Sequence, residues 1–328
     1  MTPFAPANPR REAQGLLPRG LVAHVLEPSP PACNDGEYKA DDPAAPDDQR
    51  SGLLQVTPTT AGDVTWDEMT RRLPHLSDFA TEHWLGAWRP LESLPDSYVP
   101  TVSSLGQLAF YVMAPARYAE HGKVGLRFTF RGFGTPFYGG DRQVRVEGEH
   151  LVVQDGDTAR GQRITTVRDA AQLAGIEYNR LWGPAWHDPP APADPDRPLT
   201  IEGAATLACS EILGFGFSVL EQLRVEARRE EKPSRVQLWP EHFDASVEIG
   251  AEELHRRAAF GVSPGYAAHT EPYLYVSPWS KHGLDDPYWN ADFFGGSILR
   301  YSDLIQTEDQ RKTALDFLRT GLEMMRAR

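Results

Sequence analysis

Cysteine is almost absent from this sequence. Among 328 residues only Cys33 and Cys209 occur, the first in a proline-rich segment and the second within an apolar helical pattern. We therefore expect no disulfide between them and interpret Cys209 as a buried core thiol. The sequence also lacks a Cys-x-x-Cys pair and a His-Glu-x-x-His motif, so it does not encode the zinc sites that those motifs form.

Positive charge and long apolar runs are also scarce. The chain has 33 basic against 46 acidic residues, a formal net charge of -13, and no stretch that gathers Lys and Arg into a stripe. Phosphate backbones require such a stripe, so we expect no nucleic-acid partner. No apolar run reaches the roughly 20 residues of a membrane-spanning helix, and residues 20–26 are too short for a signal peptide. We therefore predict a cytoplasmic protein with no membrane partner.

Composition divides the chain into four segments. Residues 1–62 interleave proline with aspartate and hold almost no aromatic residues, which predicts a disordered or irregular tail. Residues 63–182 form a first α+β half, and residues 183–199, with six prolines, form a stiff connector. Residues 200–328 form a second α+β half. The 40% hydrophobic content is enough for a core that packs both halves as one unit.

The first half reads as helix, strands, helix. Apolar residues recur at helical spacing up to Gly122, where the helix should end. Residues 124–130 then alternate as in a strand, and Glu147-Gly148 lies between two apolar runs as in a hairpin. A last short helix is capped by Thr166 and ends at Gly175.

The second half has the same order. An apolar stripe predicts a helix over residues 200–228, in which Gly214 and Gly216 indicate the close approach of another element. Strands follow, and Thr307 with Gln310 forms the capping pair of a final helix. We predict an α+β fold in which antiparallel sheet is flanked by helices, and one reading of the pattern is two similar helix-strands-helix halves.

Two late segments alternate in polarity. Residues 242–249 place apolar side chains on one side of an extended chain and polar ones on the other, namely His242, Asp244, Ser246 and Glu248. Residues 273–276 repeat the pattern, with Leu274 and Val276 opposite Tyr273 and Tyr275. We expect both segments in one sheet, with their polar sides pointing into a shared hollow.

The chain also resembles a protein family. The resemblance covers about residues 65–325 and rests on residues 122–127, 135–141, 234–236, 239–244, 260–265 and 271–275 and on the terminal helix. On these residues the chain is similar to a family of bacterial, largely actinobacterial proteins called domain of unknown function 5996. In that family a tryptophan is followed closely by Phe-Asp, so Asp244 matches a motif position better than His242 does. The resemblance implies one shared architecture and a bacterial origin, and it brings no activity or catalytic residue.

The leading functional hypothesis is a small-molecule binding site. Ligand pockets combine flat apolar walls with a few convergent polar groups. The proposed walls are Trp239, Tyr273, Tyr275 and Trp279, and the orienting groups are His242, Asp244 and Arg127. Arg127 is included because a guanidinium gives a carboxylate two parallel donors. The alternative is that these aromatic residues simply belong to the core.

A metal-dependent hydrolase is the first alternative. His242 and Asp244 lie two apart on a predicted strand, so they share a face, and a neighbouring strand would bring His269 and Glu271 to them. Such ligands suit a divalent metal such as zinc or iron that activates water. The same pairs also occur on ordinary solvated strand faces, so the presence of a cofactor stays open.

A protein-protein interaction module is the second alternative, because an exposed apolar patch leaves no signature in a sequence. Nucleophilic catalysis has little support, since Ser210 lies in a helical pattern without Gly-x-Ser-x-Gly. A carboxylate pair such as Asp244 with Glu271 stays open as a glycosidase-like arrangement. The sequence leaves open the ligand, the oligomeric state and whether the protein is an enzyme.

Overall fold

The computed structural model describes most of the chain from residue 90 onward and three short pieces before it. The described residues are 2–4, 60–61, 64–65, 90–129, 132–135, 138, 142–155, 158–183, 190, 194–234, 236–266, 268–291 and 293–328. Most of the predicted tail, Cys33, and residues 136–137 and 139–141 of the glycine-rich segment lie outside these residues.

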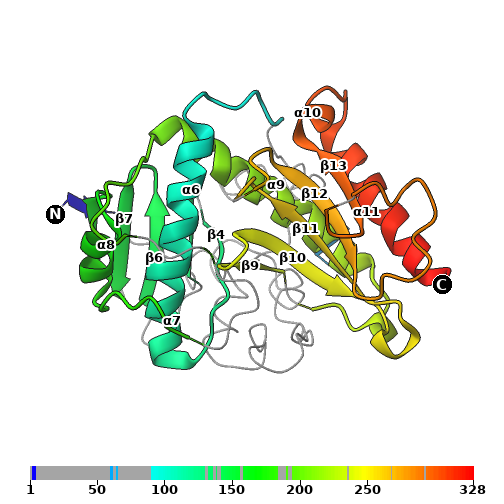
Figure 1. Cartoon of the computed structure of the whole chain (residues 1–328), viewed down its shortest axis with the longest axis horizontal. Helices are drawn as coiled ribbons and strands as arrows, with labels where there is room; N and C mark the ends of the chain where they lie inside the picture. The colour runs from blue at the N-terminus through cyan, green and yellow to red at the C-terminus, as the bar shows by residue number, and fades with distance from the viewer. Residues whose placement is uncertain are drawn as a thin grey trace.

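The first half consists of helices, a strand meander and a further helix (Figure 1). A continuous helical segment contains α6 (Tyr98–Leu108), the π-helical turn η2 (Ala109–Met113) and α7 (Ala114–His121). The strands that follow are β4 (Arg127–Thr129), β5 (Gly132–Gly134), β6 (Arg142–Glu147), β7 (His150–Asp155) and β8 (Thr158–Arg163). The half ends with α8 (Val167–Ala174).

Local signals in the sequence determine where these helices end. α7 stops at Gly122, whose φ of 65° is the left-handed conformation that glycine adopts without strain. α8 begins after Thr166, whose side chain accepts a hydrogen bond from the amide of Asp169, and ends at Gly175 with φ of 74°. The predicted boundaries at Gly122, Thr166 and Gly175 are confirmed.

The second half repeats the order helix, meander, helix. It begins with α9 (Gly203–Glu226) and the short 3-10 turn η3 (Arg229–Glu231). Its strands are β9 (Gln237–Trp239), β10 (Asp244–Ile249), β11 (Ala258–Ser263), β12 (Tyr273–Pro278) and β13 (Ser297–Arg300), with the turn η4 (Glu252–Leu254) between β10 and β11. It ends with α10 (Tyr301–Leu304) and α11 (Gln310–Arg326).

All pairings between the strands of each half are antiparallel. The strand orders are β1-β8-β7-β6-β5-β4 and β13-β12-β11-β10-β9, where β1 (Thr2–Phe4) adds to the outer edge of the first sheet and β2 (Thr60–Ala61) pairs separately with β3 (Val64–Thr65). The α+β class with antiparallel sheets flanked by helices is therefore confirmed.

The two sheets meet edge to edge at the first strand of each half. Leu126, just before β4, and Leu238 in β9 exchange two backbone hydrogen bonds of 2.8 Å. Helix α9 packs under this seam, because it contacts β4 and β5 on one side and β10 and β11 on the other. The buried apolar residues of both halves form one cluster.

Helices α9 and α11 cover one face of the second sheet. A Cβ atom at Gly216 of α9 would lie 2.0 Å from Val262 Cγ1, and one at Gly321 of α11 would lie 2.8 Å from Val276 Cγ2. Glycine therefore allows each helix to approach a β-branched residue of the sheet closely. The approach predicted from Gly216 is confirmed.

Helix α9 also satisfies the length and composition of a membrane span over Gly203–Arg224, and 72% of its most apolar window is buried inside the protein. Core helices that are packed on all sides have the same composition. Cys209 lies on this helix, fully buried, as predicted.

Two local predictions are wrong. The final helix is capped by Asp309, whose carboxylate accepts from the amide of Lys312, and not by Thr307. Gln310 instead uses its side-chain amide to bond both backbone groups of Leu91, at 2.6 and 3.0 Å. Gln310 therefore serves a long-range contact with the backbone of Leu91 in place of the local capping pair.

The strand predicted to begin at His242 begins two residues later. Pro240, Glu241, His242 and Phe243 form the turn between β9 and β10, and Asp244 is the first strand residue, opposite Trp239. Alternation holds from Asp244 to Ile249, but His242 is not part of it. The reason is Phe243, whose φ of 49° turns the chain out of the extended conformation.

Candidate functional site

The face of the second sheet that points away from α9 and α11 carries polar and aromatic side chains. We call it the polar face; its members include Asp244, Ser246, Glu248, Ser263, Tyr273 and Tyr275. On β10 this face is buried and not solvated, because Asp244, Ser246 and Glu248 are only 8%, 5% and 4% exposed. Polar groups buried this deeply need partners, and most of them bond across strands.

The turn before β10 places Asp244 on the polar face. Phe243, in the left-handed conformation, is fully buried, with its ring 4.9 Å from the ring of Phe133 and 6.0 Å from that of Tyr266. Such a conformation costs a bulky residue on the order of 1–3 kcal/mol and persists only where packing fixes it. The buried Phe243 ring therefore anchors the turn directly before the carboxylate of Asp244.

Gly261 allows Tyr275 to reach Asp244 across an intervening strand. In the register of the sheet Ser246, Gly261 and Tyr275 lie side by side on β10, β11 and β12. A Cβ atom at Gly261 would lie 2.3 Å from Tyr275 Cζ and 2.5 Å from its hydroxyl oxygen. The phenol ring therefore lies flat over Gly261, and its hydroxyl donates a short hydrogen bond to Asp244 Oδ2.

The carboxyl group of Asp244 is electrostatically unusual. Burial raises its pKa above the ordinary value of 3.8, despite the opposing effects of His242 and of the Tyr275 hydroxyl. Burial and the adjacent carboxylate raise the pKa of Tyr275 well above its usual range, and burial raises that of Tyr273 to about 12. Both tyrosines are therefore neutral hydrogen-bond donors at physiological pH.

The second carboxyl oxygen of Asp244, Oδ1, is one of several buried polar atoms in this region without a hydrogen-bond partner among the described residues. Other nearby polar groups are bonded: Trp239 Nε1, for example, donates to Ser246 Oγ at 3.0 Å. Leaving a buried acceptor unsatisfied costs about 1–3 kcal/mol, so this oxygen is the strongest single indication of a missing partner.

Tyr273 and Tyr275, which lie beside Asp244, belong to a group of aromatic rings that contact one another. The ring centroids of Tyr273 and Tyr275 are 6.1 Å apart, and those of Tyr273 and Phe293 are also 6.1 Å apart. Phe294 lies 6.2 Å from Tyr275 and 4.8 Å from Phe293. His269 stacks on Phe293 with centroids 3.7 Å apart. These five rings are called the aromatic cluster below.

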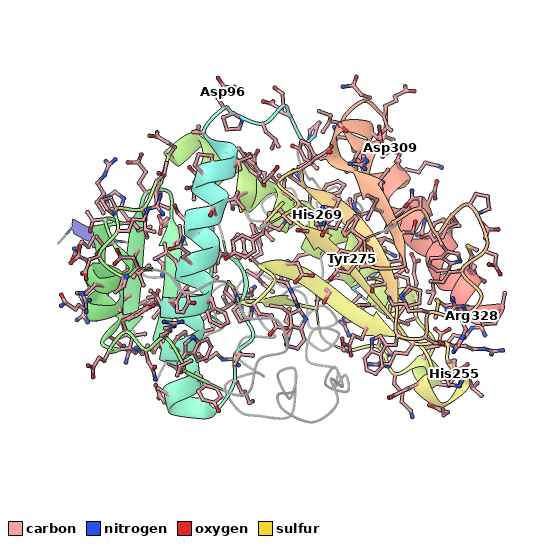
Figure 2. The ribbon with its side chains drawn as sticks, in the orientation of Figure 1. Asp96, His255, His269, Tyr275, Asp309 and Arg328 are labelled. Atoms are coloured by element: carbon pink, nitrogen blue, oxygen red, sulfur yellow. The ribbon has the colours of Figure 1, made fainter. Side chains whose placement is uncertain are left out.

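The aromatic cluster reaches the surface, whereas Asp244 lies beneath it. His269 is exposed, Phe293 is 41% exposed, and Tyr273 and Tyr275 are half-buried. Figure 2 shows His269 and Tyr275 together over the second sheet. A carboxyl group below and aromatic rings above form the candidate site, which we call the Asp244 site.

The structure brings only some of the predicted ligand-binding residues together. Asp244, Tyr273 and Tyr275 form the site. Trp239 lies at its border, where its indole N–H donates a hydrogen bond to Ser246. Trp279 lies on the same face, but about 13 Å further along the strand from Tyr275, where the guanidinium of Arg257 covers its ring at 5.3 Å.

Arg127 and His242 are not placed as predicted, because Arg127 belongs to β4 of the first sheet and His242 lies in the turn beside Asp244 and not on the strand. Arg127 is buried near the seam between the sheets, and its Nε donates to the carbonyl of Phe128 at 3.0 Å. The side chain of His242 is 48% exposed and lies 3.2 Å from the carboxylate of Glu241. Its place in the turn, outside the alternation of the strand, explains the difference.

The predicted metal ligands His242, Asp244, His269 and Glu271 are not brought together. Glu271 accepts from the amide of Ser302 at 2.9 Å and pairs with Arg300 at 3.4 Å, and His269 is stacked on Phe293. Within the part of the chain that the structure describes, no three His, Cys, Asp or Glu side chains are grouped so that they could hold a metal ion. The arrangement therefore gives no support to a metal centre.

Sequence reasoning missed Gly261, Phe293 and Phe294. Gly261 interrupts a strand pattern between Phe260 and Val262, and glycine inside a strand is a signal of close approach that could have been read. Phe293 and Phe294 lie in a loop between β12 and β13, where no periodicity shows which way a side chain points.

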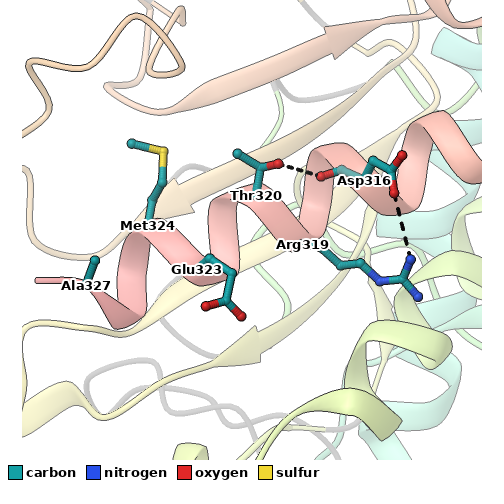
Figure 3. A pocket seen from close by; sticks show the side chains of 6 residues that line it. All are labelled: Asp316, Arg319, Thr320, Glu323, Met324 and Ala327. Atoms are coloured by element: carbon teal, nitrogen blue, oxygen red, sulfur yellow. Dashed lines mark hydrogen bonds and ion pairs between the residues drawn. The ribbon is translucent and has the colours of Figure 1, made fainter.

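Two hollows lie away from the Asp244 site. An open one runs along α11 beside Asp316, Thr320 and Glu323 (Figure 3), and a smaller one of about 210 Å³ lies between η3, η4 and the end of α11. Neither is lined by a residue of the Asp244 site. In the smaller hollow Arg326 makes two hydrogen bonds to Glu231, at 2.6 and 2.8 Å, which ties α11 to η3.

Comparison of the chain with family models, with curated proteins and with solved structures found no match. The resemblance to domain of unknown function 5996 therefore stays a prediction. The fold and the site together define an α+β protein with a buried carboxyl group beneath an aromatic cluster.

Proposed function

We propose that the protein binds a small molecule at the Asp244 site. The observation that carries the proposal is Asp244 Oδ1, a buried acceptor with no hydrogen-bond donor among the described residues. Native proteins rarely leave such an atom without a partner, because no hydrogen bond then offsets the free energy lost when the atom is removed from water. A ligand that places an N–H or O–H group against this oxygen would supply the missing bond.

The surroundings of Asp244 favour a ligand with a flat or apolar body. The rings of Tyr273, Tyr275 and Phe293 supply apolar surface next to one polar group, which is the usual composition of a small-molecule site. The hydroxyl of Tyr275 holds the other carboxyl oxygen, so the orientation of the carboxyl group is fixed before a ligand arrives. A fixed acceptor binds more tightly than a mobile one, because less freedom is lost on binding.

Binding of small aromatic amines, amides and alcohols by saturation-transfer NMR, followed by calorimetric titration of the hits, tests the proposal. Asp244→Asn keeps the shape of the side chain but presents an amide in place of a carboxylate. We expect donor ligands to bind the variant about 10- to 100-fold more weakly, the equivalent of the roughly 1.5–3 kcal/mol of a hydrogen bond to a charged group.

The matched control is Glu271→Gln, which removes a carboxylate on the adjoining loop whose partners are Ser302 and Arg300. It should leave the affinity unchanged. If every hit binds Asp244→Asn as tightly as the unaltered protein, or if Glu271→Gln weakens binding as much, the Asp244 site is not where small molecules bind.

A further inference from the structure

We infer that the group recognised at the Asp244 site is an organic cation, such as an ammonium, a methylated ammonium or a guanidinium. The inference rests on the proposed binding function and names the chemistry of its ligand. It is carried by two features that lie next to each other, the carboxyl groups on the floor of the site and the aromatic cluster above them.

The floor of the site is acidic. Asp244 and Glu241 are 8% and 5% exposed, so two carboxyl groups are buried within three residues of each other. The carboxyl group of Asp244 forms no ion pair with Lys or Arg among the described residues, and the side chain that donates a hydrogen bond to it there is Tyr275. His242 lies close to both carboxyl groups, but its side chain is half in solvent and pairs with Glu241. A buried carboxylate without a cationic partner is costly, and a cationic ligand offsets that cost most effectively.

The walls of the site are suited to a cation as well. The faces of aromatic rings attract cations through their quadrupole, and sites for methylated ammonium groups are built from several such rings. Tyr273, Tyr275, Phe293 and Phe294 supply four rings within contact of one another. The Phe294 ring already interacts with a cation of the protein itself, since Lys281 Nζ lies 5.9 Å from its centroid.

The other basic groups near the site are held by partners of their own. Lys281 Nζ donates to the carbonyl of Gly295 at 3.0 Å and to Ser277 Oγ at 3.3 Å. Arg300, beside Tyr273 in the next strand, pairs with Glu271. Neither group is bonded to Asp244, so a positive charge brought by a ligand meets a carboxyl group that forms no ion pair with Lys or Arg among the described residues.

Isosteric ligand pairs separate the role of charge from that of shape. Choline and 3,3-dimethylbutanol have nearly the same shape, but only choline is charged; benzylammonium and benzyl alcohol form a second pair. We expect calorimetry to show that each cation binds at least 10-fold more tightly than its neutral counterpart. Asp244→Asn should abolish that preference.

A second variant tests the rings without touching the carboxyl group. Phe293→Leu removes an aromatic face from a side chain that is 41% exposed, so the fold should tolerate it. It should weaken the binding of both cations several-fold. Leu254→Ala, at an exposed apolar position in η4, is the control and should change nothing.

The outcomes distinguish the two proposals. If neutral isosteres bind as tightly as the cations and Asp244→Asn weakens both equally, the site binds small molecules but the cation inference is overturned. If no compound of the charged or neutral panel binds in an Asp244-dependent way, both proposals are overturned.

Discussion

Replacing Gly261 with alanine tests the arrangement on which the site depends. In the structure the Tyr275 ring occupies the space that a side chain at position 261 would fill, and a Cβ atom there would lie 2.3 Å from Tyr275 Cζ. Ordinary contact begins near 3.4 Å. The ring must therefore retreat by about 1 Å or tilt, and either movement takes the hydroxyl away from Asp244.

The expected cost follows from two opposing terms. Loss of a hydrogen bond to a carboxylate costs about 1.5–3 kcal/mol when the acceptor stays buried. Alanine in a strand gains roughly 0.5–1 kcal/mol over glycine because the unfolded chain loses less freedom. We therefore expect Gly261→Ala to lower the free energy of unfolding by about 1–2 kcal/mol.

Urea denaturation of the single and double variants tests whether Gly261→Ala loses stability because the hydrogen bond from Tyr275 to Asp244 is broken. Tyr275→Phe alone removes the hydroxyl from Asp244. If Gly261→Ala acts by breaking the same bond, adding Tyr275→Phe to it should cost little, and the two effects should fall short of additivity by about 1.5–3 kcal/mol.

Gly203→Ala is the matched control, because a Cβ atom at this helix position meets its nearest neighbour, Glu149 Cγ, at an ordinary 3.6 Å. It should be neutral or slightly stabilising. The reasoning is refuted if Gly261→Ala is as stable as the unaltered protein, or if its effect adds fully to that of Tyr275→Phe.

Three further predictions concern the stability of the fold. Burial raises the pKa of Asp244 above 3.8, so the stability that its carboxyl group contributes is complete below pH 3.8 and is lost as the pH rises through the raised pKa. Urea titrations between about pH 4 and pH 8 should therefore show the unaltered protein losing stability relative to Asp244→Asn as the pH rises. Gly216→Ala forces a methyl group against Val262, 2.0 Å away, and should cost about 1–3 kcal/mol by calorimetry. Thr166→Ala removes the cap of α8 and should cost about 1 kcal/mol, with hydrogen exchange faster in its first turn.

Much of the fold was predictable because it depends on short-range signals. Gly122 and Gly175 end helices because glycine adopts positive φ without strain, and Thr166 begins one because its hydroxyl satisfies a free amide. The alternation from Asp244 to Ile249 predicted a strand with two unlike faces. Each of these signals involves residues within a few positions of one another.

The terminal helix and the start of β10 show where local signals fail. Thr307 and Gln310 have the spacing of a capping pair, yet Gln310 bonds Leu91, which lies 219 residues away in the chain. His242 fits the alternation of the strand, yet the burial of the Phe243 ring against Phe133 fixes a turn there. In both cases a long-range contact outweighs the local preference.

The sequence by itself determined the class of fold, the limits of several helices and strands, and the membership of Asp244, Tyr273 and Tyr275 in one patterned region. Only the tertiary structure decided which of these side chains meet. Strand order and register place Gly261 between Ser246 and Tyr275, and so let the Tyr275 hydroxyl cross β11 to reach the carboxyl group of Asp244 on β10. Pairing between strands that are 12 or more residues apart is set by the packing of the whole core, which no local pattern encodes.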